Sequence, residues 1–239
     1  TFAKAKFWSR YKYLRNFTDE IGLDFIPLDS NLHAFHPLGH QKTHTLTSAT
    51  GGLIFQKHFR HYYYATSGFS YKEQIKVGIK YQDIDVGGFC DPVLLPLLGT
   101  ESLDFISDGM QYSRVEKTLR ILNYEPVHRY LNVCVSADDS WKNCSVCPKC
   151  CRTLMTLDSV GRIEEFKQVF NIDKYRKEEK RRYICRQMLM AKKDSFAHGN
   201  IMLAKQHGVK LPYVMFWFVA LEHYWSRVRE FIKKFLLKY

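Results

Sequence analysis

The chain lacks any uninterrupted apolar run of about 18 or more residues, so no segment predicts an ordinary transmembrane helix. It also lacks a signal-peptide pattern, internal repeats and low-complexity stretches. Acidic residues are scarce beside basic ones: 24 Asp and Glu stand against 36 Lys and Arg, which gives a formal charge of +12. That excess suits an anionic partner such as a nucleotide, a nucleic acid or a lipid surface, although basic residues also serve as a solvated surface.

With 239 residues, of which 46% are apolar, the chain is long enough to bury a sizeable core. The first part alternates between helix-like and strand-like segments. The expected helices are 3–20, 43–59 and 113–123, and the expected strands are 23–30, 61–68, 103–106 and 130–136. Helices between short buried strands imply βαβ units, an α/β fold and a Rossmann-like parallel sheet.

Segment 69–100 is rich in glycine and proline, which predicts a long binding loop or lid. After Cys151 the pattern is helical to the end. The sequence therefore predicts a Rossmann-like domain over 1–161, with a cysteine knuckle at 134–151, and a helical C-terminal region over 162–239.

Four of the seven cysteines have metal-ligand spacing: Cys144-x-x-Cys147-x-x-Cys150, with Cys134 ten residues upstream on an expected strand. Four thiolates predict a structural zinc ion, because no coordination position stays open for water. A Cys₄ iron–sulfur cluster and a redox pair are the alternatives. A clustered, odd number of cysteines without a secretory signal favours metal over disulfides, and therefore the cytoplasm.

The other three cysteines are expected to pack in apolar surroundings. Cys151 is adjacent to Cys150 and cannot easily join the same tetrahedron, so it is interpreted as part of helix packing. Cys90 and Cys185 are interpreted as small buried residues.

Candidate ligand-binding residues follow the expected strands. Ser67 and Gly68 end one strand, where backbone can approach a nucleotide closely; the alternative is an ordinary turn. Asp91, before Pro92, is a candidate to bind a substrate amide or to cap a turn. Arg114 and Lys117 lie near a helix start, where they could face phosphate or carboxylate.

Ser113 and Glu116 have the spacing of a capping box, in which each side chain bonds the other residue's backbone N–H. A structural role is the interpretation for both residues.

The cysteine arrangement opening into "CRTLMTLDSVG" resembles the 7-cyano-7-deazaguanine synthase-like group of PP-loop ATP pyrophosphatases. "DPVLLPLL" (91–98), "ISDGMQYSRVEKT" (106–118) and "YLNVCVS" (130–136) resemble further blocks of that group, as do "DSNL" (29–32) and "THT" (43–45). The resemblance covers roughly residues 10–170. It implies an adenine nucleotide alpha hydrolase-like fold, a structural zinc at the four cysteines, and ATP with Mg²⁺. ATP would adenylate a small carboxylate or purine-like substrate for attack by ammonia.

The sequence departs from that group at one point. The group's ATP loop, Ser-Gly-Gly-x-Asp-Ser, is not present: "SATGG" (48–52) and "TSGFS" (66–70) both lack the Asp. The loop is expected either upstream of Thr1 or not at all, and ATP turnover by this chain alone is expected to be poor. The alternative function is a non-catalytic, zinc-stabilised module that binds nucleotide, RNA or a protein partner.

The last segment, from Pro212, predicts a long helix with apolar residues at steps of four and three. Its apolar face must be covered. Three coverings are open: the chain's own domain, a second copy in a homodimer, or an anionic membrane surface.

Overall fold

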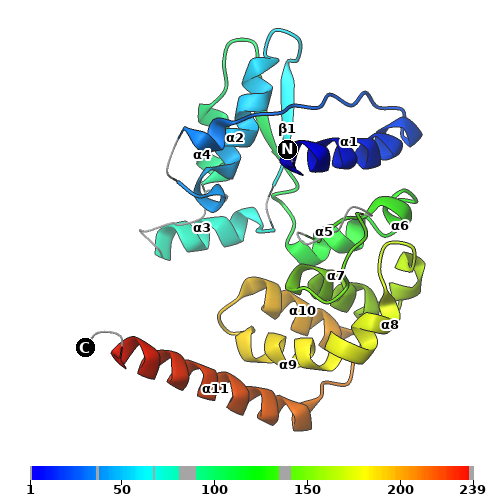
Figure 1. Cartoon of the computed structure of the whole chain (residues 1–239), viewed down its shortest axis with the longest axis vertical. Coiled ribbons are helices and arrows are strands. Elements are labelled where there is room, and N and C mark those ends of the chain that lie inside the picture. Colours follow the sequence, from blue (N-terminus) through cyan, green and yellow to red (C-terminus); the bar gives the residue numbers. More distant parts are fainter. Residues whose placement is uncertain (1, 36–37, 67, 81–89, 135–140, 237–239) are drawn as a thin grey trace. The chain divides into compact units, whose positions relative to one another are not determined.

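The computed structural model describes residues 2–35, 38–66, 68–80, 90–134 and 141–236. The chain divides into two compact units. Figure 1 colours the chain by its position in the sequence, from blue to red. The first unit joins Thr1–Leu23 to Thr118–Tyr239, and the second is Asp24–Lys117. The expected boundary after residue 161 falls inside the first unit.

Both units consist mostly of helices. The elements of the second unit are η1 (Leu32–Ala34), α2 (His40–Ile54), β1 (His61–Ala65), α3 (Tyr71–Lys80), α4 (Asp91–Leu97) and β2 (Asp104–Asp108), followed by α5 (Arg114–Arg120) at the boundary. Those of the first unit are α1 (Phe2–Glu20), α6 (Val127–Tyr130), α7 (Pro148–Ser159), η3 (Ile163–Phe166), α8 (Ile172–Lys174), η4 (Tyr175–Glu179), α9 (Lys180–Met190), α10 (Ser195–Gln206) and α11 (Tyr213–Leu236).

The sheet of the second unit is a parallel pair, β1 and β2, in register from His61 opposite Asp104 to Ala65 opposite Asp108. Its connection contains α3 and α4, which confirms one βαβ unit. A small core of Ala49, Leu95 and Phe105 joins α2 and α4 to β2.

Helix α2 approaches this sheet closely at Gly52. A Cβ atom there would lie 2.9 Å from Tyr62 Cδ2 and 3.0 Å from Phe105 Cε1. Glycine in a helix interior is destabilising by about 1 kcal/mol relative to alanine, so this glycine is explained by the close packing that it permits.

The expected Rossmann-like sheet is only partly found, because the described residues form two strands rather than four. Residues 23–30 are irregular, and Leu23, Ile26 and Leu28 are exposed. Pro27 also has no N–H to donate to a ladder. Residues 131–134 are likewise irregular, and 135–136 lie outside the described residues. The prediction of a strand at 23–30 was wrong, and so was that of a strand at 130–136 over its described residues, since Tyr130 ends α6.

The prediction of a long binding loop or lid over 69–100 was also wrong where residues are described, because α3 and α4 lie there. Helix α3 begins with an unpredicted capping box: Ser70 N–H donates to Glu73 Oε2 at 2.6 Å, and Ser70 Oγ accepts from Glu73 N–H at 3.4 Å. Helix α4 carries Pro92 in its first turn, where the missing N–H of proline breaks no hydrogen bond within the helix. Gly78 and Pro96 lie within α3 and α4, so glycine and proline in this segment do not mark a loop.

The first unit is built around α7, which contacts η3, η4, α9 and α10. Its core includes Leu154 and Leu157 from α7, Phe166 from η3 and Tyr175 from η4, all with no exposed area. Thr156 Oγ1 on α7 also donates to Asn200 Oδ1 on α10 at 2.9 Å.

Helix α1 is fastened to this unit by hydrogen bonds from far along the chain. Trp141 Nε1 donates to Ser9 Oγ at 2.9 Å, and Tyr13 hydroxyl donates to the Tyr130 carbonyl at 3.2 Å. These contacts make the N-terminal helix part of the unit that carries the cysteines.

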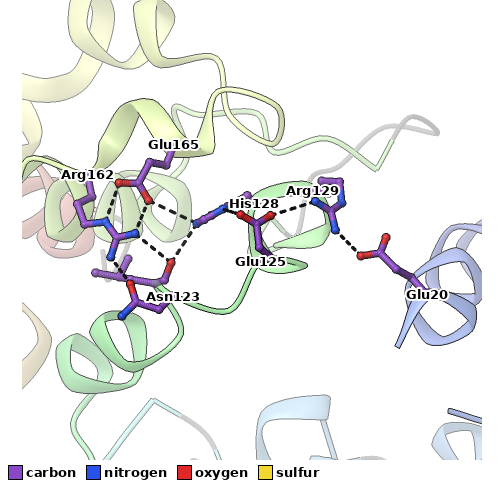
Figure 2. Close-up of polar contacts among 8 residues, drawn as sticks. Glu20, Asn123, Glu125, His128, Arg129, Arg162 and Glu165 are labelled. Atoms are coloured by element: carbon purple, nitrogen blue, oxygen red, sulfur yellow. Dashed lines mark hydrogen bonds and ion pairs between the residues drawn. The ribbon is translucent and has the colours of Figure 1, made fainter. Parts of the chain in front are cut away.

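Figure 2 shows a chain of charged contacts in the same unit. Arg162 Nε donates to Glu165 Oε1 at 2.6 Å, and His128 Nε2 lies 3.6 Å from Glu165 Oε2. Arg129 pairs with Glu20 at the end of α1. The hydrogen bond from Arg162 holds the pKa of Glu165 below its ordinary value. Most of these side chains are exposed, so solvent screens the network.

Candidate metal centre

The four predicted cysteines converge on one point. Their sulfur atoms all lie within 4.8 Å of one another, although Cys134 comes from a separate segment. Sulfur–sulfur distances are 3.9 Å for Cys134 and Cys147, 3.9 Å for Cys144 and Cys150, and 3.4 Å for Cys147 and Cys150. These four cysteines could hold a metal ion.

The spacing of the sulfurs suits a tetrahedral metal. Metal–sulfur bonds of about 2.3 Å give a tetrahedron with sulfur–sulfur edges of about 3.8 Å. The three distances of 3.4 to 3.9 Å lie close to that value. They are far from the sulfur–sulfur bond of about 2.05 Å in a disulfide, and all seven cysteines are free.

Backbone N–H groups support the sulfurs on the tight turn. Cys144 Sγ accepts from Cys147 N–H at 3.3 Å, and Cys147 Sγ caps α7 by accepting from Cys150 N–H at 3.5 Å. Ser145 adopts the left-handed region with φ of 66°, which makes the turn tight. Its hydroxyl accepts from Asn171 N–H at 2.8 Å, so a distant contact holds that conformation.

The thiols of the cluster differ in acidity. Burial alone would raise the pKa of Cys144, but the backbone N–H groups of Val146 and Cys147 lower it to about 7. Burial raises the pKa of Cys147 and of Cys150. Metal binding at these two sulfurs would therefore have to displace protons.

Asn143 is the residue that brings Cys134 to the cluster. Its Oδ1 accepts from the N–H groups of Val133 and Cys134 at 2.8 and 3.1 Å. Its Nδ2 donates to the carbonyls of Leu131 and Val169 at 2.8 and 3.0 Å. The buried side-chain amide of Asn143 therefore bonds the backbone groups of 131–134 that, in the predicted strand, would have bonded to a neighbouring strand.

The remaining cysteines lie apart from the four. Cys151 is buried on α7 and its Sγ lies 3.8 Å from the Ser145 carbonyl, which confirms the packing interpretation. Burial raises its pKa to about 12. Cys185 is buried as expected, whereas Cys90 is exposed, so the interpretation of Cys90 as buried was wrong.

A second group of predicted residues meets at the carboxyl end of the sheet. Lys117 Nζ donates to Thr66 Oγ1, just after β1, at 2.7 Å. Burial, and then the neighbouring charge of Arg114, lower the pKa of Lys117. Gly109 follows β2 with φ of 81°, and a Cβ there would lie 3.4 Å from Lys117 Cε. Gly68 is buried in the turn after β1, and Ser67 lies outside the described residues.

The capping box of α5 is confirmed: Ser113 N–H donates to Glu116 Oε2 at 2.7 Å, and Ser113 Oγ accepts from Glu116 N–H at 3.4 Å. The box fixes the start of the helix that carries Arg114 and Lys117.

Asp91 makes a different contact. It is fully buried at the start of α4, where Oδ1 accepts from Thr45 Oγ1 on α2 at 2.6 Å. Burial raises the pKa of Asp91, while Thr45 and His44 oppose that rise. Asp91 thus joins two helices. Thr45, which completes the contact, was noted in the sequence only as part of the block THT (43–45), with no role given to it.

Comparisons with known proteins provide no relative: no protein-family model, no curated protein and no solved structure matches the chain. None of the helices in the described ranges combines the length and apolar content needed to cross a membrane.

Proposed function

We propose that the chain is a zinc-stabilised part of an ATP-dependent ligase resembling 7-cyano-7-deazaguanine synthase. The observation that carries the proposal is the convergence of Cys134, Cys144, Cys147 and Cys150, which are the most specific part of that resemblance. Zinc is the metal because it takes tetrahedral thiolate ligands at these distances. Its role is structural, since four sulfurs fill the coordination sphere.

In the proposed reaction, a carboxylate oxygen of the substrate attacks the α-phosphorus of ATP. An acyl-adenylate forms and pyrophosphate leaves. Ammonia then attacks the acyl carbon, the bond to AMP breaks, and an amide, AMP and a proton are released. Zinc takes part in neither step.

The carboxyl end of β1 and β2 supports this chemistry, because ligands of parallel sheets bind at that edge. Lys117 and Arg114 place two basic side chains there, with the acidic Glu73 and Asp108 nearby. Gly109, with φ of 81°, lets the side chains of Lys117 and Thr66 pack close to the backbone at this edge. We assign these cations to the phosphates of the nucleotide, whose charge they would offset.

Metal analysis of the purified protein tests the zinc assignment, with one zinc per chain as the expected result. A protein that binds iron with sulfide, or no metal, would contradict it. For the ligase, AMP and pyrophosphate release is measured in the intact protein with ATP, Mg²⁺, ammonia and a panel of carboxylic acids.

Lys117→Met should weaken ATP binding about tenfold or more, because it removes one charge-assisted contact to phosphate. Lys72→Met, at an exposed position on α3, is the matched control and should have no effect. If the intact protein binds zinc but neither binds nor turns over ATP, the ligase proposal fails, and a zinc-stabilised binding module is left.

A further inference from the structure

Helix α11 carries an apolar face that no described part of its unit covers. The helix packs on α9 through its opposite side, where Val219 is buried and Glu222 Oε1 accepts from Arg182 Nη2 at 2.6 Å. Eight large apolar side chains, each between 50% and 78% exposed, form the α11 apolar band: Tyr213, Val214, Trp217, Phe218, Leu221, Tyr224, Trp225 and Ile232.

The band is continuous and wide. At about 100° per residue, its members span about 140° of the helix circumference. None of the charged residues of α11 falls inside that arc. Over 24 residues the helix is about 36 Å long. An apolar surface of this size marks an interaction site on a protein.

Basic side chains border the band. Arg229 and Lys233 are exposed along one edge, and with Trp225 they line a surface hollow of about 540 Å³. Arg227 is exposed near the other edge. The acidic residue of this hollow, Glu222, is already paired with Arg182. The surroundings of the band are therefore suited to an anionic partner.

We propose that α11 is an interfacial helix that lies flat on an anionic membrane. Its band would enter the boundary between headgroups and acyl chains, and Arg227, Arg229 and Lys233 would contact lipid phosphates. Four of the eight band residues are Trp or Tyr, whose rings combine an apolar body with a polar atom and favour that boundary. The net charge of +12 acts in the same direction.

The width of the band favours a membrane over a second copy of the chain. A two-stranded coiled coil buries only the a and d positions. That seam would take Val214, Phe218, Leu221 and Trp225 and would leave Trp217 at its margin. A membrane surface covers the whole band at once.

The proposal is tested by flotation of the full chain with vesicles of phosphatidylcholine and phosphatidylserine in equal amounts, and with vesicles of phosphatidylcholine alone. Trp217→Ala combined with Phe218→Ala should reduce the vesicle-bound fraction about tenfold. Both side chains are exposed, so the far-ultraviolet circular dichroism should not change. The matched control is Val93→Ala with Leu97→Ala, which removes two equally exposed apolar side chains from α4.

A charge variant tests the lipid specificity. Arg229→Gln with Lys233→Gln should reduce binding to the anionic vesicles about tenfold or more. Lys205→Gln with Lys210→Gln removes the same charge from exposed positions outside α11 and should change binding by less than about twofold.

The proposal is overturned if the chain does not float with anionic vesicles, or if the band variant floats like the unaltered chain. A concentration-dependent dimer in sedimentation that the band variant abolishes, without flotation of the unaltered chain, would assign the band to a second copy instead. Equal flotation with both kinds of vesicle would refute the anionic specificity.

Discussion

Replacing Asn143 with alanine should destabilise the protein strongly, because four backbone groups each lose a hydrogen bond at once. Cys134 N–H is buried and would remain unsatisfied at about 1–3 kcal/mol. The buried Val169 carbonyl would lose one of two hydrogen bonds, since it also accepts from the backbone N–H of residue 143 at 3.3 Å. Val133 N–H and the Leu131 carbonyl are half-buried, so water can replace part of their loss. We expect the free energy of unfolding to fall by about 3 kcal/mol, which is a large share of the stability of a domain.

The measurement is urea-induced unfolding of the zinc-loaded protein. Asn123→Ala is the matched control: Asn123 is exposed and accepts one hydrogen bond, from Arg162 Nη1 at 2.6 Å, so its loss should be below about 1 kcal/mol. Zinc transfer to a chromogenic chelator should also become about tenfold faster in Asn143→Ala, because Cys134 is no longer held in place.

Asn143→Asp separates the two halves of the amide. It keeps an acceptor for Val133 and Cys134 but cannot donate to Leu131 and Val169. Asn143→Asp should destabilise the protein as much as Asn143→Ala does, because it loses the donor half of the amide and also adds a buried charge. If Asn143→Ala and Asn123→Ala unfold at the same urea concentration, the role given to Asn143 is refuted.

Three further changes follow from individual contacts. Cys144→Ser should abolish stoichiometric zinc, whereas Cys151→Ser should keep it, and equal zinc contents of the two variants would contradict the ligand set. Glu165→Gln should destabilise the protein near pH 7 but hardly at about pH 3. The pKa of Glu165 is lowered in the folded state, so its ionised form stabilises the fold above the unfolded value of 4.5, and this stability is lost as pH falls. An effect on the urea midpoint that does not depend on pH would argue against the ion pair. Thr45→Val removes the hydroxyl that donates to Asp91 Oδ1. The urea midpoint should fall more at pH 7 than at about pH 4, because the raised pKa of Asp91 favours the folded state at low pH. A larger fall of the urea midpoint at about pH 4 than at pH 7 would exclude a buried carboxylate at Asp91.

Local features of this protein could be predicted from its sequence. Helix α1, the capping box of Ser113 and Glu116, and the long helix after Pro212 depend on residues a few positions apart, so spacing suffices. The four cysteines were identified for the same reason, since Cys144, Cys147 and Cys150 already share one tight turn. A parallel sheet was expected and β1 and β2 pair in parallel, but the helices α3 and α4 that connect them were predicted as a loop.

The failures concern strands, whose identity depends on partners. Residues 131–134 have strand-like composition, but the N–H groups of Val133 and Cys134 bond to the side chain of Asn143, ten and nine positions away, instead of to a neighbouring strand. Residues 23–30 have no strand beside them among the described residues. A period-two or apolar pattern shows only that a segment can be extended, and it contains no information on whether a ladder partner exists.

The sequence by itself determined the number and spacing of the thiols, the positive charge and the apolar face of the last helix. Only the tertiary structure decided that Asn143 brings Cys134 to the other three sulfurs, because that contact joins segments whose proximity is set by packing. It also decided that α11 rests on α9 by its narrow side, through Val219, and leaves its wide apolar face in solvent. Which face of an amphipathic helix is buried depends on the shape of the surface that receives it, and no pattern within the helix records that shape.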